Sequence, residues 1–194
     1  MNSPSTNASP DATQPYLVVA LTGFMGSGKS STGQELAALL GWVFVDLDSE
    51  IETRKGVPVR ELFRQHGEAV FREIEHETLR DCLARSERPT IFALGGGTFV
   101  QPANVALLNA RHAVTVFLET PVEEMLQRCG VEDEYDPENT RPLAANTKGF
   151  RELYEQRLPS YRQANTTIQT AGKSAVVIAR EIADRFGFEA LRND

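Results

Sequence analysis

The chain contains few cysteines, no long apolar run and fewer basic than acidic residues. Its two cysteines, Cys82 and Cys129, show neither the Cys-x-x-Cys pattern nor the spacing of metal ligands, so we expect reduced thiols in a cytoplasmic protein. No apolar run approaches the roughly 20 residues that cross a bilayer. A net charge of −7, from 20 Lys and Arg against 27 Asp and Glu, argues against a basic patch for nucleic acid or membrane surfaces. We therefore expect neither a nucleic-acid nor a membrane partner.

The first residues also lack the features of a targeting signal. Residues 1–15 hold no Lys, no Arg and no apolar stretch, which argues against a secretory signal and predicts a disordered polar tail. A chain of 194 residues is long enough for one compact domain, which we place at residues 16–190. We expect this domain to be a monomer.

The rest of the chain alternates short apolar segments with amphipathic ones. The predicted strands are residues 16–22, 43–45, 90–94, 113–118 and 167–170. The main predicted helices are residues 29–40, 67–85, 104–110, 122–129, 147–164 and 175–186, with short helical pieces at 49–66 interrupted at Gly56 and Pro58. Parallel strands need a crossover between them, so this order indicates an α/β fold with helices on both faces of a parallel sheet.

The most specific motif is Gly-Phe-Met-Gly-Ser-Gly-Lys-Ser at residues 23–30, which follows the first predicted strand and begins a helix. This GxxxxGKS pattern is the phosphate-binding P-loop, whose glycines let backbone N–H groups surround phosphate oxygens at a positive helix end. Lys29 is expected to reach the β- and γ-phosphates, and the Ser30 hydroxyl to bind Mg²⁺. The expected nucleotide-binding residues are Gly26, Ser27, Gly28, Lys29, Ser30 and Ser31.

Two aspartates, Asp46 and Asp48, follow the second predicted strand. Their spacing places both on one side of the chain if the extended conformation continues. Because a P-loop enzyme needs an acidic group near Mg²⁺, Asp46 is the expected metal-binding residue, and Asp48 could accept a hydroxyl proton during phosphoryl transfer. The alternative is that Asp48 only caps a helix that begins at Ser49.

Three consecutive glycines, Gly95, Gly96 and Gly97, end the third predicted strand. Glycines allow a backbone to approach a ligand closely and to donate N–H groups to it, although a plain turn is an equal alternative. Ligands of open parallel sheets bind beyond the carboxyl ends of the strands. The P-loop, the two aspartates and the three glycines all follow strand ends, so we expect them at one edge of the sheet.

Two arginines on predicted helices are candidates for contacts with an anion. Arg157 falls within the apolar stripe of helix 147–164, where a charged side chain must either pair with a carboxylate or face a ligand. We favour the ligand-facing interpretation. Arg72 has Glu68 and Glu75 at helical spacing, so a solvated salt bridge is its simplest interpretation.

A polar segment at about 130–146 differs in character from the rest of the chain. It contains two prolines and carries five acidic residues between positions 132 and 138. Such a segment suits a lid, and Arg141 within it could bring positive charge over a transferring phosphate. A loop arginine without a role is the alternative. We expect the acidic residues to repel a nucleotide, an effect that salt would screen.

Taken in order, these motifs resemble those of the shikimate kinases, a P-loop family of the nucleoside-monophosphate-kinase-like group. The matching stretches are GFMGSGKS at 23–30, DLD at 46–48, FREIE at 71–75, LGGG at 94–97, TRPL at 140–143 and QRLPSY at 156–161. The resemblance implies a three-layer α/β/α fold, with a five-stranded parallel sheet in the order 2-3-1-4-5 and a lid. It also implies MgATP-dependent phosphorylation of the shikimate 3-hydroxyl, giving 3-phosphoshikimate and ADP.

The same resemblance implies roles for individual residues. The acceptor-binding region would lie around residues 48–80, and the substrate-binding residues would be Asp48, Phe63, Phe71, Arg72, Gly95, Gly96, Gly97 and Arg157. The two arginines would grip the shikimate carboxylate, because forked guanidinium donors suit a carboxylate. Arg128 would lie near adenine, and Arg141 would reach the phosphates from the lid. The implied catalytic residues are Lys29, Asp48 and Arg141, and the implied metal ligands are Ser30 and Asp46.

Other functions are compatible with the same motifs. A different small-metabolite or nucleotide kinase would keep the P-loop and change the acceptor arginines. A GTP-binding switch usually carries Asn-Lys-x-Asp for guanine, a tetrad that this sequence lacks. A relative that binds nucleotide but has lost turnover is the third alternative.

Overall fold

The structure is a computed structural model that describes residues 17–131 and 146–190. In chain order its elements are β1 (Val18–Thr22), α1 (Lys29–Leu40), β2 (Val43–Asp46), α2 (Leu47–Lys55), α3 (Val59–Arg85), β3 (Thr90–Ala93), the 3₁₀ helix η1 (Thr98–Val100), α4 (Pro102–Ala110), β4 (Val114–Glu119), α5 (Val122–Cys129), α6 (Thr147–Tyr161), β5 (Thr166–Gln169) and α7 (Ala175–Phe186). The tail expected at 1–15, Arg141 and the acidic residues between 132 and 138 lie outside the described residues. Across the described ranges, no helix has the length and apolar character that a membrane crossing requires.

The strands form one parallel sheet in the order β2-β3-β1-β4-β5. All residues of the central strand β1 are buried, because helices cover both of its faces. Alternate β1 residues divide between two cores: Ala20 packs on the side of α3, and Leu21 packs on the side of α1. The predicted fold class and strand order are therefore confirmed.

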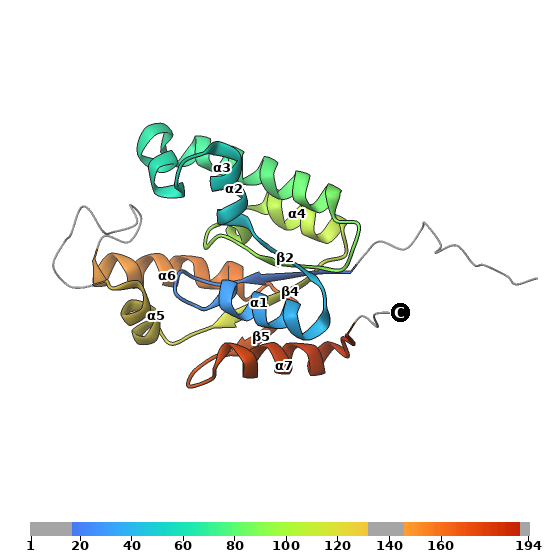
Figure 1. Ribbon diagram of the computed structural model, residues 1–194. Coiled ribbons are helices and arrows are strands. Elements are labelled where there is room, and N and C mark those ends of the chain that lie inside the picture. Colours follow the sequence, from blue (N-terminus) through green and yellow to red (C-terminus); the bar gives the residue numbers. More distant parts are fainter. Residues whose placement is uncertain (1–16, 132–145, 191–194) are drawn as a thin grey trace, which may run out of the picture.

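The helices form the two outer layers of the α/β/α sandwich. Helices α1 and α7 cover one face of the sheet, and α2, α3 and α4 lie on the other (Figure 1). Helix α6 packs beside the P-loop, where the ring of Phe24 contacts the rings of Phe150 and Tyr154 at centroid distances of 4.8 and 5.5 Å. The second residue of the P-loop motif is thus part of an aromatic core, which fixes the loop against α6.

Helices α2 and α3 make up the region predicted to bind the acceptor. The expected interruptions are confirmed, because α2 ends at Lys55 with Gly56 as its C-cap, and α3 begins after Pro58. Residue Gly67 has a non-helical conformation (φ 76°), so the segments expected on either side of it join as one kinked helix. Helix α6 ends at Tyr161, three residues earlier than predicted, soon after Pro159.

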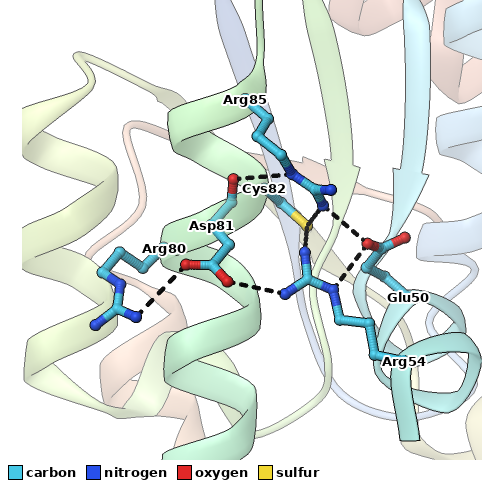
Figure 2. Close-up of polar contacts among 6 residues, drawn as sticks. All are labelled: Glu50, Arg54, Arg80, Asp81, Cys82 and Arg85. Carbon is cyan, nitrogen blue, oxygen red and sulfur yellow. Dashed lines mark hydrogen bonds and ion pairs between the residues drawn. The ribbon is translucent and has the colours of Figure 1, made fainter.

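A polar cluster joins these two helices (Figure 2). Arg54 of α2 donates to Glu50 at 2.9 Å and to Asp81 of α3 at 3.1 Å. Arg85 of α3 reaches back to Glu50 at 3.0 Å. Both guanidinium groups also approach the buried Cys82 sulfur, at 3.6 and 3.8 Å, and burial raises the pKa of that thiol. The cluster therefore links α2 to α3.

Candidate active site

The carboxyl ends of β1, β2 and β3 meet at one edge of the sheet. Ala93 of β3 pairs with Leu21 of β1 on one side and with Asp46 of β2 on the other. The P-loop follows β1, Asp46 ends β2, and the three glycines follow β3. The motifs singled out in the sequence therefore lie together, as expected.

The P-loop surrounds the beginning of α1. Gly28 is the N-cap residue in the left-handed conformation (φ 88°, ψ 18°), and no side chain within residues 17–131 and 146–190 caps the helix. Glycine adopts this conformation without steric cost, and the uncapped N–H groups of the first helical turn form an anion-binding end. Lys29 Nζ donates to the Phe24 carbonyl at 2.8 Å, which folds the lysine over the loop. The buried Ser27 hydroxyl has no hydrogen-bond partner within the described residues.

Asp46 is bonded to both the P-loop helix and α2. Its Oδ2 accepts the Ser30 hydroxyl, and its Oδ1 accepts the Ser49 N–H at 3.1 Å. Asp46 is therefore the N-cap of α2, which begins at Leu47, and the alternative that Asp48 is this cap is wrong. The extended conformation ends at Asp46, so Asp48 belongs to the first turn of the helix.

A cavity of about 290 Å³ opens between the P-loop and the ends of β2 and β3. It is lined by Met25, Gly26, Gly28, Lys29, Ser30, Ser31, Asp46, Asp48, Leu94, Gly96 and Arg128. The exposed Arg128 donates to the Gly26 carbonyl at 3.1 Å and to Glu124 at 2.7 Å. Six candidate nucleotide residues thus line a common space with the candidate base Asp48: Gly26, Gly28, Lys29, Ser30, Ser31 and Arg128. The buried Ser27 does not line this cavity, and Arg141 lies outside the described residues.

Two of the glycines in Gly95–Gly97 make room for charged side chains. A Cβ on the first would lie 2.8 Å from Oδ1 of Asp48, and a Cβ on the third would overlap the guanidinium of Arg72. A Cβ on the second would lie 3.9 Å from Nη1 of Arg157. The absence of a side chain at Gly95 and at Gly97 is therefore needed for Asp48 and Arg72 to approach the loop, whereas a Cβ on Gly96 would make only an ordinary contact with Arg157.

Arg72 is held by a buried carboxylate and by aromatic rings. It donates to Glu75 at 2.9 Å and to Glu68 at 3.1 Å. Glu75 is only 1% exposed, so the prediction of a solvated salt bridge is wrong for this partner. The guanidinium lies 5.8 and 5.2 Å from the ring centroids of Phe63 and Phe71, which pack together at 4.2 Å. The guanidinium of Arg72 therefore packs against the rings of both phenylalanines.

The sequence did not single out Glu75 or Thr98 as site residues. Thr98 of η1 donates its hydroxyl to Glu75 at 2.7 Å. Burial raises the pKa of the Glu75 carboxyl, whereas Arg72 and Thr98 favour the ionised form and the charge of Asp48 opposes it. A carboxylate that is buried here must keep its hydrogen bonds, so Glu75 fixes the position of the Arg72 guanidinium.

Arg157 differs from Arg72 in having no carboxylate partner among the residues that the structure describes. It is 7% exposed, donates to the Gly96 carbonyl at 3.2 Å and lies 5.8 Å from the ring centroid of Phe24. Within residues 17–131 and 146–190, no acidic side chain forms an ion pair with it. The structural ion pair, one of the two alternatives left by the sequence, is therefore not found in the described part of the chain. A buried cation in this state favours an anionic ligand.

The sheet order, the P-loop between β1 and α1, and the aspartate at the end of β2 define a P-loop phosphotransferase. The sequence profile of the shikimate kinase family matches residues 25–186. The chain belongs to the shikimate kinase family, and it is therefore a kinase that phosphorylates a hydroxyl group with ATP as co-substrate. This membership sets aside the GTP-binding switch.

Individual relatives agree with this membership. The chain is 38% identical to a shikimate kinase from Persephonella marina, over 86% of this chain and 97% of that protein. It is 39% identical to a shikimate kinase from Moorella thermoacetica, over 86% and 92% respectively. A solved structure of a shikimate kinase from Acinetobacter baumannii in complex with shikimate matches with a TM-score of 0.78 at 35% identity, covering 88% of this chain and 93% of that chain.

Proposed function

We propose that this protein transfers the γ-phosphoryl group of MgATP to the 3-hydroxyl of shikimate. The observation that carries the proposal is the approach of Arg72 and Arg157 to one glycine loop, next to Asp48 and the P-loop cavity. Two guanidinium groups suit a carboxylate. An acceptor that carries this carboxylate on a hydroxylated ring would present a ring hydroxyl to Asp48. Shikimate has both groups.

The proposed mechanism relies on positioning and on charge neutralisation. Arg72 and Arg157 hold the acceptor carboxylate, and Asp48 orients the acceptor hydroxyl and accepts its proton as the oxygen attacks the γ-phosphorus. Lys29 and the lid residue Arg141 stabilise the negative charge on the transferring phosphoryl group. The remaining nucleotide contacts are proposed for Gly26, Ser27, Gly28, Ser30 and Ser31, with Arg128 near adenine.

Ser30 and Asp46 are the proposed holders of Mg²⁺. Their side-chain oxygens are already joined by a hydrogen bond beside the P-loop. Mg²⁺ in kinases takes one or two protein oxygens and completes its coordination with phosphates and water, so a hydroxyl and one carboxylate fit this ion. When bound, Mg²⁺ neutralises phosphate charge.

We also propose that the protein works as a cytoplasmic monomer without nucleic-acid or membrane partners. The net charge of −7 supports the absence of a nucleic-acid partner. The two cysteines, neither of which forms a disulfide, suit a reducing compartment. Sedimentation equilibrium tests the monomer, because a dimer would double the mass of 21.4 kDa.

An acceptor-dependent ADP-release assay on the purified protein tests the proposal. Shikimate, gluconate and nucleoside monophosphates are compared as acceptors with ATP and Mg²⁺, and phosphorus NMR of the product identifies the phosphorylated hydroxyl. We expect turnover with shikimate alone and loss of turnover on chelation of Mg²⁺. A Lys29→Met variant purified in parallel controls for contaminating kinases. Turnover with another acceptor would contradict the proposal, and nucleotide binding without turnover would identify an inactive relative.

A further inference from the structure

Tyr161, at the end of α6, donates its hydroxyl to the Gly96 carbonyl in the glycine loop. The same carbonyl oxygen accepts Arg157 Nη1 at 3.2 Å. The tyrosine is fully buried, and its ring stacks on Phe117 of β4 with a centroid distance of 5.3 Å and an interplanar angle of 26°. In the sequence, Tyr161 is the last residue of the QRLPSY stretch at 156–161 and was not among the expected site residues. Its ring is thus anchored in the core while its one polar atom reaches the candidate acceptor site.

The Gly96 carbonyl needs such an anchor. Glycine has more backbone freedom than any other residue, and three glycines in succession leave their peptide groups free to rotate unless something holds them. The Gly96 carbonyl and the Gly97 N–H belong to one planar trans peptide, so the two groups point in opposite directions. Two donors from α6 direct the carbonyl toward that helix, and the Gly97 N–H must therefore point away from it.

The shared carbonyl also couples Tyr161 to Arg157. A carbonyl oxygen has two lone pairs and accepts both donors at once. The two side chains lie one helical turn apart on α6. The tyrosine therefore fixes the Gly96 carbonyl, and this carbonyl in turn orients the guanidinium of Arg157. Burial raises the pKa of Tyr161 to about 12, so its hydroxyl stays protonated and able to donate at neutral pH.

We propose that Tyr161 is a positioning residue for the acceptor, an inference that rests on the proposed function. Its hydroxyl holds the Gly96 carbonyl, and through it the Arg157 guanidinium and the Gly97 N–H, in the orientation that binds the acceptor carboxylate. Tyr161 itself does not touch the acceptor. Its loss weakens shikimate binding and leaves nucleotide binding unchanged, because within the described residues the hydroxyl is hydrogen-bonded to Gly96 and to no P-loop residue.

The test compares Tyr161→Phe with Tyr154→Phe, which makes the same change on the same helix. Tyr154 is also buried, at 8% exposure, but its hydroxyl donates to no other described residue. We expect Tyr161→Phe to raise the KM and the dissociation constant for shikimate about five- to tenfold, the effect of one lost hydrogen bond. The KM for ATP should stay within about twofold of wild type, and Tyr154→Phe should match wild type in both.

A second readout separates positioning from a general loss of structure. Wild type and Tyr161→Phe are titrated with shikimate and with its carboxamide, which lacks the negative charge that Arg157 would hold. The preference for the acid is the ratio of the dissociation constants for carboxamide and shikimate. We expect this ratio to fall in Tyr161→Phe by the same factor as the affinity for shikimate. An unchanged KM for shikimate would overturn this inference alone. So would an equal loss of affinity for shikimate, its carboxamide and ATP. A wild-type protein that neither binds nor phosphorylates shikimate would overturn the proposed function, and this inference with it.

Discussion

Replacing Arg157 with methionine should leave the fold intact while removing acceptor affinity. Methionine keeps an unbranched apolar stem and removes a charge that is 7% exposed and pairs with no acidic side chain among the described residues. The lost hydrogen bond to the Gly96 carbonyl costs about 1 kcal/mol, and the lost contact with the Phe24 ring costs up to about 2 kcal/mol. Relief of the desolvated charge offsets these losses by several kcal/mol. We therefore expect the free energy of unfolding to stay constant or to rise by about 1–2 kcal/mol.

The expected effect on shikimate is in the opposite direction. A charge-assisted pair between a guanidinium and a carboxylate in a partly buried site is worth about 2–4 kcal/mol, because both charges are screened little by water. The KM for shikimate should therefore rise roughly 30- to 700-fold. The ADP-release assay with a shikimate titration measures this change, and urea unfolding measures the stability.

The matched control is Arg162→Met, which removes an arginine that follows α6 and pairs with Glu119 at 3.1 Å. Its side chain is 61% exposed, so we expect a change below about 1 kcal/mol in stability and none in the shikimate KM. The reasoning would be refuted if Arg157→Met lost more than about 2 kcal/mol of stability and kept the wild-type KM, since that result would make Arg157 a structural residue.

Three further variants test other parts of the site. Asp48→Asn should lower kcat by about 100-fold or more with little change in the KM for ATP, and wild-type turnover would exclude Asp48 as the base. Burial raises the pKa of Glu75 above its ordinary value of 4.5, so the folded state holds this proton more tightly than the unfolded chain. The stability of wild type should therefore decline, relative to Glu75→Gln, as the pH rises from 4.5 through the raised pKa; a pH-independent difference in thermal unfolding would contradict this. Arg54→Met should lower the unfolding free energy by about 1 kcal/mol, and less in high salt, because it breaks one ion pair within α2, to Glu50, and one between α2 and α3, to Asp81. Arg64→Met, at a side chain that is 73% exposed, is its control, and equal losses in the two variants would show that the cluster does not join the helices.

Local signals in the sequence were sufficient for the P-loop and for several helices. The predicted bounds of α1, α5 and α7 agree with the structure, because each helix begins after a turn signal and ends at a glycine in the left-handed conformation. The location of the site also followed from the sequence, since parallel strands must end at a common edge. No local pattern specifies the strand order, which was predicted from the resemblance to a family.

The start of α2 was ambiguous for a physical reason. Asp46 and Asp48 are both good capping residues, and the pattern of apolar positions is too short to decide between them. In the structure Asp46 is the cap. Its carboxylate accepts the Ser49 N–H of α2 and also the Ser30 hydroxyl of the P-loop. The bond to Ser30 depends on the folded sheet and is therefore invisible in the sequence of α2.

Long-range contacts account for the residues that the sequence did not reveal. In the segment Phe71–Glu75 the acidic residues follow the pattern of a solvated helix face, and only the packing of α3 against η1 buries Glu75. Tyr161 reaches a carbonyl 65 positions earlier in the chain. Its available signal was a tyrosine hydroxyl at the end of the QRLPSY stretch, since a hydroxyl that is buried needs a partner. The identity of that partner required the fold.

A crystal structure of the protein with shikimate and ADP tests the central claim most directly. We expect the shikimate carboxylate between the guanidinium groups of Arg72 and Arg157, a ring hydroxyl beside Asp48, and the nucleotide phosphates on the P-loop. Shikimate bound with its carboxylate away from both arginines, or outside the cavity beside the P-loop, would contradict the account.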